Sequence, residues 1–285
     1  MPSINYAYVN GRFVPEAEAT VSIFDRGFLY GDGVFDTMRV YGGKIFRLSE
    51  HVNRLVTSID LLGIDLEETS QHLQGVCEET VTRNKVVNGM TRVFVTRGLS
   101  NVGLSGKSGA RPTIVAVAQE RAFSTSAAPL QVIVADTRLD GHSRLVRVKS
   151  ANRLPYVLAK LEAERRGADD AILMNEAGHA VELTASNLFL YQEGKLITPP
   201  LIDGALPGIT RSLVLMLAAQ TGIDAQESSL TLDMTRHAEE AFATNSLFEI
   251  SPIASIDNRL LDGRRITARL QEAFREHVRD ELLLP

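Results

Sequence analysis

Two hairpin signals near the start of the chain constrain its fold more than any other feature of the sequence. The segment 6–14 carries Asn10-Gly11 between two alternating apolar stretches, and the segment 33–48 carries Gly42-Gly43 in the same way. Such glycine dipeptides favour tight turns between antiparallel strands. Strands that are joined by hairpins and then followed by helices are typical of α+β folds, so we expect this class rather than a regular alternation of parallel strands and helices.

Hydrophobic periodicity predicts the other elements, in an order that mixes helices and strands. A helix is expected over 48–63, with Ser49 as its N-cap and Gly63 at its end, and a second over 67–84. Further helices are expected after Asn152 and over 207–222, 231–240 and 266–283, and further strands over 91–97, 113–119, 131–136, 145–149, 170–175, 180–191, 195–200 and 239–245.

A small, polar, proline-containing stretch at 121–130 is typical of a linker between domains. We therefore predict an N-terminal α+β domain over 1–120 and a C-terminal domain over 131–285. A chain of 285 residues is long enough to bury a core in each of them.

Composition and spacing exclude several classes of protein. The net charge of −5 gives no basic field for nucleic acid, and the most apolar helical stretch, 212–219, is too short to span a bilayer. The segment 1–14 has no signal-peptide pattern. A single cysteine, Cys77, excludes internal disulfides and suits a reducing cytoplasm. No two of the six histidines have the spacing of metal ligands, so we expect no metal site.

Lys149 follows the expected strand 145–149, and Ser150 and Asn152 then resemble the start of a helix. A lysine in this place either ends the strand in water or uses its amine for chemistry. The residues around Lys149 leave both interpretations open.

Three other features point to a bound ligand, each with a plainer alternative. Gly208, Ile209 and Thr210 begin the helix 207–222, and the free N–H groups of a first turn bind anions, although a threonine also serves an ordinary helix start. Ser246 follows a strand and offers a hydroxyl, unless it is a simple turn residue. Glu182 lies between apolar residues in its strand and, if buried, needs a cationic partner or a protonated ring nitrogen. Together these features fit an aldehyde cofactor that carries a phosphate and a pyridine nitrogen.

Several linked motifs, in order along the chain, resemble those of the class IV, fold-type IV pyridoxal-phosphate enzymes. This family includes branched-chain aminotransferases, D-amino-acid aminotransferases and aminodeoxychorismate lyases. The resemblance implies a two-domain α+β fold in which each domain is a mixed sheet or barrel with packed helices. The motifs are FDRGFLYGDGVFDTMRVYGGKIFRLSEHVNRL at 24–55, RVFVTRG at 92–98, VKSANRLPYVLAKLEA at 148–163, VELTASNLF at 181–189, LPGITR at 206–211 and ATNSLFEISPI at 243–253.

The resemblance also implies a role for each matching residue. Lys149 would bind pyridoxal 5'-phosphate as a Schiff base and later move the proton, and Glu182 would keep the ring nitrogen protonated so that the ring accepts electrons. Arg54 would bind the phosphate through its planar guanidinium, and Asn187 would support Glu182. The other expected phosphate contacts are Ile209, Thr210, Ser246 and Leu247.

The substrate side of the resemblance is mixed. Leu183 replaces the glycine that usually follows the family's glutamate, and Met90 replaces a tyrosine of the branched-chain enzymes. Residues 99–101 lack the Arg-x-His sequence of the D-amino-acid enzymes. The residues that match the branched-chain enzymes are Tyr30, Phe35, Arg39 and Arg92, whereas Thr37, Asn152-Arg153-Leu154 and the segment 244–247 resemble the lyases.

Two reactions therefore stand as alternatives. One is transfer of an amino group between a 2-oxo acid and a branched-chain or other apolar amino acid, a D-amino acid or an amine. The other is release of pyruvate from aminodeoxychorismate to give 4-aminobenzoate. We favour the aminotransferase, because Phe35 and Arg39 share one face of a regular strand as an apolar wall and a carboxylate partner, with Thr37 between them. Arg92 or Arg97 also offers a partner for a carboxylate, and a structural ion pair is an equally good interpretation of each. Family relatives are typically homodimers, so we expect a cytoplasmic homodimer whose partners are small amino and oxo acids.

Overall fold

The structure is a computed structural model of the chain, and it describes residues 5–99, 103–105, 111–123 and 128–284. Contacts divide the chain into two compact units, Met1–Phe123 with Val148–Asn152, and Ser124–Arg147 with Arg153–Pro285. The sequence placed Lys149 in the C-terminal domain, whereas its short segment packs with the first unit because it pairs there with a strand. Two predictions fall partly outside the described residues: the linker at 121–130, and the segment 99–101, which lacks the Arg-x-His sequence of the D-amino-acid enzymes.

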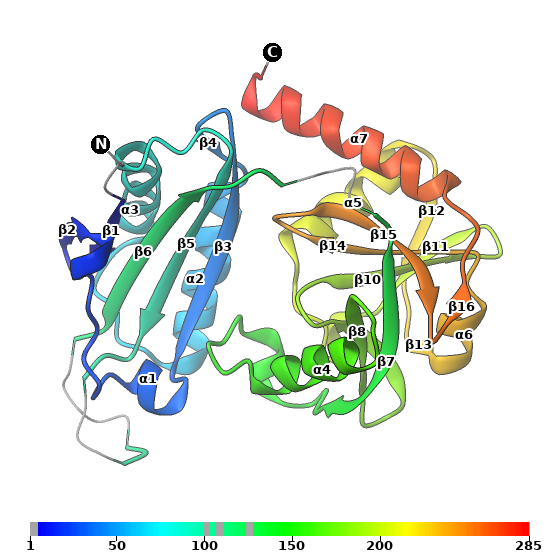
Figure 1. Cartoon of the computed structure of the whole chain (residues 1–285), viewed down its shortest axis with the longest axis horizontal. Coiled ribbons are helices and arrows are strands. Elements are labelled where there is room, and N and C mark those ends of the chain that lie inside the picture. The colour runs from blue at the N-terminus through cyan, green and yellow to red at the C-terminus, as the bar shows by residue number, and fades with distance from the viewer. Residues whose placement is uncertain (1–4, 100–102, 106–110, 124–127, 285) are drawn as a thin grey trace. The chain divides into compact units, whose positions relative to one another are not determined.

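The first unit is a sheet of six strands with two long helices against one face (Figure 1). The strand order is β2-β1-β6-β5-β3-β4, and all neighbouring strands are antiparallel. Its elements are β1 (Tyr6–Val9), β2 (Arg12–Pro15), η1 (Glu16–Glu18), α1 (Arg26–Tyr30), β3 (Gly33–Tyr41), β4 (Lys44–Ile45), α2 (Leu48–Leu62), α3 (Ser70–Arg83), β5 (Gly89–Thr96) and β6 (Thr113–Glu120).

Local sequence explains most of this unit. Both predicted hairpins are confirmed, since β1 pairs with β2 and β3 with β4 across the expected glycine turns. Gly63 ends α2 in the left-handed conformation, at φ 60°, as predicted. The N-cap prediction for Ser49 is wrong: the cap is Arg47, itself left-handed at φ 52° and without a side-chain cap bond, so that α2 begins at Leu48.

The second unit is a mixed sheet that closes on itself. The strand order is β12-β11-β10-β14-β15-β7-β8-β9-β13, and an additional pairing of β10 with β9 completes a ring through β14, β15, β7 and β8. Its elements are β7 (Leu130–Leu139), η2 (Arg144–Arg147), α4 (Leu154–Arg165), β8 (Asp170–Asn175), β9 (His179–Leu183), β10 (Asn187–Gln192), β11 (Lys195–Thr198), η3 (Leu201–Asp203), α5 (Ile209–Gln220), β12 (Asp224–Glu227), β13 (Leu230–Thr231), α6 (Leu232–His237), β14 (Glu240–Asn245), β15 (Glu249–Ile256), β16 (Arg259–Leu260) and α7 (Arg265–Leu282). The predicted α+β class with a mixed sheet or barrel is confirmed.

Two predicted strands differ from the structure. The segment 145–149 is not a strand, because Asp140 accepts hydrogen bonds from the N–H groups of His142 and Ser143 and folds the chain into the short turn η2. The strand expected over 180–191 is two strands, since the chain reverses where Leu183 N–H donates to the carbonyl of Ser186 at 2.7 Å.

The C-terminal helix α7 shows how the second unit buries an amphipathic element. Its apolar residues Leu270, Phe274 and Val278 are buried, at the spacing of one helix face. The buried carboxylate of Glu240 accepts hydrogen bonds of 2.9 Å from two backbone N–H groups in the first turn of α7. Within the described part of the chain, no helix has the length and apolarity that crossing a membrane requires.

Candidate active site

Lys149 is held against the first unit by its backbone. Phe35 N–H donates to the carbonyl of Lys149 at 3.0 Å, and Ala151 N–H donates to the carbonyl of Gly33 at 2.9 Å. Ser150 forms a bridge with Val34 on the same edge of β3. The short partner β4 reaches only the far end of β3, so this segment occupies the remaining edge. Lys149 thus takes its position from a strand that lies far earlier in the sequence.

One face of this sheet carries most of the predicted substrate residues. Cross-strand neighbours on the face are Phe35 with Phe94, Thr37 with Arg92, and Arg39 with Met90. The alternate residues of β3 point to the other face of the sheet, which α2 and α3 cover. We therefore call the face formed by these six residues the second face. The rings of Phe35 and Phe94 are stacked, with centroids 5.4 Å apart. The sequence therefore placed Phe35, Thr37 and Arg39 on one side of the strand correctly.

Two basic side chains, those of Arg92 and Lys149, lie beside aromatic rings of this face. The guanidinium carbon of Arg92 lies 5.5 Å from the ring centre of Phe35 and 5.8 Å from that of Phe94. The amine of Lys149 lies 5.0 Å from the ring centre of Phe35. Arg92 Nε donates to the hydroxyl oxygen of Thr37 at 2.7 Å. Burial lowers the pKa of Arg92, although a guanidinium stays charged at neutral pH. Cations over aromatic faces are attracted by the ring quadrupole, so this face holds positive charge next to apolar surface.

Arg39 is placed differently from Arg92 on the same face. Its guanidinium carbon lies 4.2 Å from the ring centre of Phe123 and 5.0 Å from that of Tyr41, and the side chain is buried. These contacts give Arg39 a packing role, which competes with the carboxylate contact that the sequence suggested.

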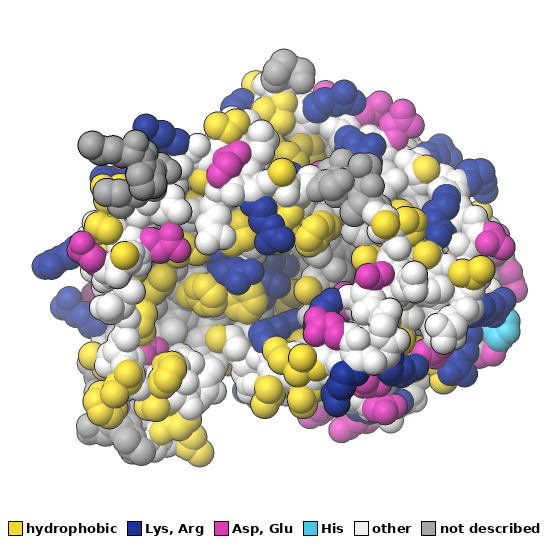
Figure 2. Space-filling model, viewed as in Figure 1, with side chains coloured by type: hydrophobic (Ala, Val, Ile, Leu, Met, Phe, Trp, Pro, Cys, Tyr) yellow, Lys and Arg dark blue, Asp and Glu magenta, His cyan; other side chains and the backbone are white. Residues whose placement is uncertain are grey.

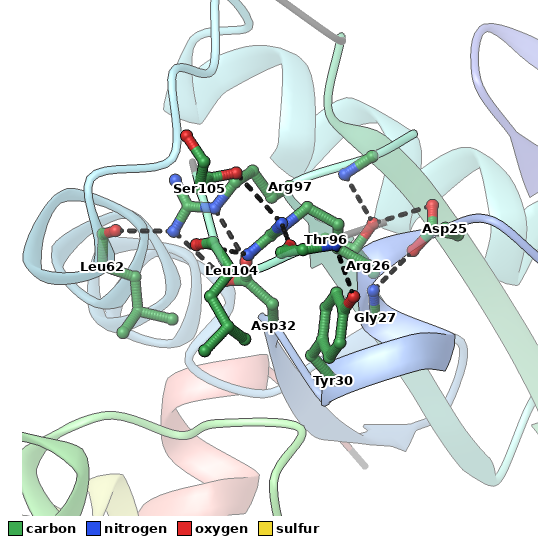
Figure 3. Close-up of polar contacts among 12 residues, drawn as sticks. Asp25, Arg26, Gly27, Tyr30, Asp32, Leu62, Thr96, Arg97, Leu104 and Ser105 are labelled. Atoms are coloured by element: carbon green, nitrogen blue, oxygen red, sulfur yellow. Dashed lines mark hydrogen bonds and ion pairs between the residues drawn. The ribbon is translucent and has the colours of Figure 1, made fainter. Parts of the chain in front are cut away.

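Arg97 belongs to a separate polar cluster in the first unit (Figure 3). Its Nε and Nη2 atoms donate to both carboxylate oxygens of Asp32, at 2.8 and 3.1 Å. The guanidinium also donates to the carbonyls of Leu62 and Gly63, at 2.8 and 2.6 Å. Burial opposes ionisation of Asp32, but hydrogen bonds from Arg97 and Arg26 outweigh it and hold its pKa below the usual range. Arg97 is therefore engaged at the end of α2, while Arg92 lies on the second face.

Arg26 and Tyr30 complete this cluster around the residues 103–105 (Figure 3). Arg26 is buried, binds Asp32 at 2.7 Å and donates to the carbonyls of Gly103 and Ser105, at 2.9 and 3.1 Å. Gly103 N–H donates to the hydroxyl of Tyr30 at 2.9 Å, and the Arg26 guanidinium lies 5.1 Å from the centre of that ring. The sequence singled out Tyr30 from this group but missed Arg26.

Arg54 lies on the helix-covered side of the sheet, where Asp36 fixes it. Arg54 Nε and Nη2 donate to the two oxygens of Asp36 at 2.9 and 2.8 Å, and His51 Nδ1 lies 2.8 Å from the same carboxylate. Burial opposes ionisation of Asp36, but Arg54 and His51 together hold its pKa far below the usual range. Burial also lowers the pKa of His51, despite the attraction of Asp36. The sequence did not identify Asp36 or His51; the spacing of His51 and Arg54, three residues apart on one helix, was the available signal.

Glu182 and Asn187 lie where the sheet of the second unit closes, since they are the paired residues between β9 and β10. Glu182 is buried, and its Oε2 accepts from Leu206 N–H at 3.0 Å and from Asn187 Nδ2 at 3.4 Å. Asn187 Nδ2 also donates to the Leu206 carbonyl at 2.9 Å. The pair therefore holds the chain just before α5, and the role of Asn187 in supporting Glu182 stays a prediction.

The N-terminus of α5 brings Gly208, Ile209 and Thr210 next to this pair. Gly208 is the N-cap, with no side-chain cap bond, and Thr210 is buried. A Cβ atom on Gly208 would lie 1.9 Å from the side-chain oxygen of Asn187, so any larger residue here would displace Asn187 from its present position. The first turn of α5 follows directly, and its N–H groups and dipole favour an anion.

The turn after β14 contains Ser246 and Leu247. Asn245 Oδ1 accepts from the N–H groups of Leu247 and Phe248, at 3.0 and 2.8 Å, and Asn245 Nδ2 donates to Ser186 at 2.9 Å. The Leu247 amide thus has a partner in its own turn, and a phosphate contact there would compete with Asn245. The sequence missed this role of Asn245, although an asparagine before two turn residues is a signal for it.

Each unit carries groups that complement part of a phosphorylated aldehyde with a ring nitrogen. An amine lies beside an aromatic ring in Lys149, a guanidinium is fixed by a carboxylate in Arg54, a helix N-terminus is kept clear of a side chain by Gly208, and a buried carboxylate is held in Glu182. These groups are the chemical complements of an aldehyde, a phosphate and a pyridinium.

Comparison with known proteins gives a consistent result. The family model described as amino-transferase class IV matches residues 33–256. A putative branched-chain-amino-acid aminotransferase of Methanocaldococcus jannaschii is 38% identical over 282 residues, which covers 94% of this chain and 95% of the relative. A D-alanine aminotransferase of Listeria monocytogenes is 31% identical over 282 residues, with 95% of each chain covered.

Solved structures with the same fold include one that contains a cofactor. The T.th. branched-chain amino acid aminotransferase with pyridoxamine 5'-phosphate has a TM-score of 0.91 and 29% identity, covering 96% of this chain and 94% of that one. A putative 4-amino-4-deoxychorismate lyase of Legionella pneumophila has a TM-score of 0.85 and 30% identity, covering 92% of this chain and 96% of that one.

Proposed function

The chain belongs to the class IV aminotransferases, and from this premise we propose that it moves an amino group between an apolar amino acid, or D-alanine, and a 2-oxo acid. The family and its relatives favour this reaction over the lyase. The donor set and the pyridoxamine 5'-phosphate of a related structure support pyridoxal 5'-phosphate as the cofactor.

Each proposed cofactor contact has its own chemical task. When bound, pyridoxal 5'-phosphate withdraws electrons from the substrate carbon that loses a proton. We propose that Lys149 would hold the aldehyde carbon covalently through Nζ, and that its amine, released when the amino group of the substrate takes its place, would move that proton. We assign the phosphate to Arg54, Ile209, Thr210 and Ser246, and the ring nitrogen to Glu182, with Asn187 holding the carboxylate in place.

The observation that carries the substrate proposal is the second face, where Arg92 lies beside the rings of Phe35 and Phe94. The amine of Lys149 lies beside the ring of Phe35. A guanidinium binds a carboxylate through two parallel N–H groups, and the adjoining rings suit an apolar side chain and exclude water. Arg92 is a better candidate than Arg97 for this contact, because Asp32 already binds Arg97 through two donors.

The direct test is covalent labelling combined with a product assay. Borohydride reduction of the holo-protein should fix the cofactor on the peptide that contains Lys149, and Lys149→Ala should lose turnover. Lys160 on α4 is the matched control, and labelling there would reject the assignment. Leucine and D-alanine, each with 2-oxoglutarate, then decide the amino donor.

The lyase reaction is the second candidate, because Thr37 resembles the residue of the lyases at this position and lies on the second face. Its hydroxyl oxygen accepts a hydrogen bond from Arg92 at 2.7 Å. A structure described as a putative 4-amino-4-deoxychorismate lyase also shares the fold. Incubation of the holo-protein with 4-amino-4-deoxychorismate separates the two reactions. Formation of 4-aminobenzoate and pyruvate, without transamination of any amino acid, would replace the aminotransferase assignment.

We also propose that the protein forms a homodimer. Exposed hydrophobic side chains gather over α1 and over α4 (Figure 2). On α4 they are Leu154, Val157, Leu158 and Leu161, at the spacing of one helix face, and near α1 they are Ile23, Phe24, Phe28 and Leu29. Surfaces of this kind mark sites of association. Light scattering should give twice the mass of one chain, and Leu158→Asp should shift the protein toward monomer.

The proposed cellular location rests on cysteine usage. The one cysteine of the chain, Cys77, is a free thiol and is buried in the first unit. A reducing compartment such as the cytoplasm suits this composition.

A further inference from the structure

We infer that Tyr156 is a positioning residue for Glu182, whose carboxylate it orients and keeps ionised for the ring nitrogen of the cofactor. This inference rests on the proposed function, because it concerns the carboxylate assigned there to the cofactor. The tyrosine lies on α4 and the carboxylate on β9, so the sequence separation of 26 residues hides the contact. The motif at 148–163 contains Tyr156, but nothing in the sequence assigned a role to that residue.

The geometry gives each oxygen of Glu182 its own donors. Tyr156 Oη donates to Oε1 at 2.9 Å, whereas Leu206 N–H and Asn187 Nδ2 donate to Oε2. A buried carboxylate that accepts at both oxygens is restricted to one orientation of its plane. Hydrogen bonds to the ionised form of a carboxylate also favour that form. Tyr156 therefore contributes both to where the carboxylate points and to its charge.

Arg153 fixes the tyrosine ring in turn. Its guanidinium carbon lies 3.3 Å from the centre of the Tyr156 ring, and Nη2 donates to the carbonyl of Thr184 at 2.9 Å. The tyrosine also packs against the buried cluster that contains Ala159 and Val181. Arg153, part of the segment that resembles the lyases, thus connects the tyrosine with the loop that follows Glu182.

Tyr156 remains a donor at all relevant pH values. Burial raises the pKa of its hydroxyl well above the ordinary value, and the charge of Glu182 raises it further. A phenol that is never ionised always presents its proton to the carboxylate. The contact therefore acts as a constant feature of the site rather than as a pH switch.

The consequence lies in the proton shared between Glu182 and a pyridine nitrogen. A carboxylate with fewer hydrogen bonds attracts that proton more strongly, which leaves the ring less able to withdraw electrons. Loss of the Tyr156 hydroxyl should therefore slow the chemical step and raise the pH at which the visible absorption of the holo-protein changes. Substrate binding should be almost unaffected.

The test compares Tyr156→Phe with the native protein, in both the native and the Glu182→Gln background. Tyr156→Phe keeps the ring under Arg153 and should lower kcat about tenfold, with KM changed less than about twofold. The pH midpoint of the absorption change should rise. In the Glu182→Gln background the same substitution should change kcat less than about twofold, because the two residues act as one unit. Tyr191→Phe, which alters a half-buried tyrosine of β10, is the control and should leave both quantities unchanged.

Two outcomes would overturn the inference. One is an unchanged kcat and absorption midpoint in Tyr156→Phe, and the other is an equal loss of kcat in both backgrounds, which indicates a structural role independent of Glu182. If Tyr156→Phe does not fold, Arg153→Met decides: it should move both quantities in the same direction by less, and no movement rejects the inference. A native protein that never binds pyridoxal 5'-phosphate would instead reject the proposed function.

Discussion

The two faces of strand β3 use charge in different ways. On the helix-covered face, Asp36 is buried against Arg54 and His51, between the apolar residues Val34 and Met38. On the second face, Arg92 contacts two aromatic rings and a hydroxyl. Asp36 of β3 therefore lies in an ion-paired core, whereas its neighbours Phe35 and Thr37 lie on a face where the guanidinium of Arg92 contacts aromatic rings.

The two faces should therefore differ in what their charged groups contribute: Asp36 to the stability of the fold, and Arg92 to the binding of substrate. Removing one partner of a buried ion pair leaves an uncompensated charge, which is strongly destabilising. A cation held by rings and a neutral hydroxyl keeps its charge for an anionic ligand. We therefore expect substitutions at Asp36 to act on folding and substitutions at Arg92 to act on substrate binding.

The largest expected effect is that of Asp36→Asn on the free energy of unfolding. The substitution leaves Arg54 without its carboxylate in a buried site, so we expect a loss of about 3–5 kcal/mol in denaturant unfolding of the apo-protein. Asp60→Asn, at an exposed position of α2, is the matched control and should change stability by less than about 0.5 kcal/mol. Equal stability of the two variants would remove the distinction between the faces.

Arg92→Ala should weaken the use of the 2-oxo acid with little effect on folding. A charge-assisted hydrogen bond contributes about 1.5–3 kcal/mol, so kcat/KM should fall roughly tenfold to a hundredfold. Arg97→Ala should show the opposite pattern, with lower stability and a smaller change in KM, because Arg97 binds Asp32 and the end of α2. If Arg97→Ala alone raised KM, the carboxylate contact would belong to Arg97.

The buried His51 predicts a dependence of stability on acid pH. Burial lowers its folded-state pKa below the ordinary 6.5, so below that pH the unfolded chain binds a proton that the folded chain does not. Stability should then fall as the pH drops from 6.5 toward the folded pKa, with a slope of up to about 1.4 kcal/mol per pH unit. Denaturant titrations between about pH 7 and pH 5 measure it. His51→Asn should flatten this slope, and an unaltered slope would assign the effect to other histidines.

Thr37→Val gives the smallest expected effect. It removes the hydroxyl that accepts from Arg92, a neutral partner that contributes about 0.5–1.5 kcal/mol, so KM for the 2-oxo acid should rise by roughly twofold to tenfold. Thr37→Ser keeps the hydroxyl and should behave as the native protein. A large loss of 4-aminobenzoate formation, with transamination retained, would instead connect Thr37 with the lyase reaction.

Local patterns predicted much of the fold but failed where side chains redirect the backbone. The glycine turns of both hairpins and the end of α2 at Gly63 followed from the sequence, because such turns depend on neighbouring residues. The stretch before Lys149 alternates like a strand, yet Asp140 and Ser143 turn it into η2 through side-chain contacts with the backbone. Hydrophobic alternation does not register that competition.

The sequence by itself determined which residues share a face. Alternation along β3 places Phe35, Thr37 and Arg39 together. Resemblance in linked motifs also identified Lys149 and Glu182 as candidates. These properties depend on residues that are near in the chain or on the identity of single residues.

Only the tertiary structure decided which groups become partners. Lys149 reaches Phe35 because its segment fills the edge of β3, and Glu182 meets Tyr156 because α4 packs beside the strand that closes the ring. Arg92 lies on β5 and Arg97 directly follows that strand, but a long-range neighbour, Asp32, engages only Arg97. The physical reason is that hydrogen bonds and ion pairs form between groups brought together by packing of distant segments, and the periodicity of a sequence carries no information about that distance.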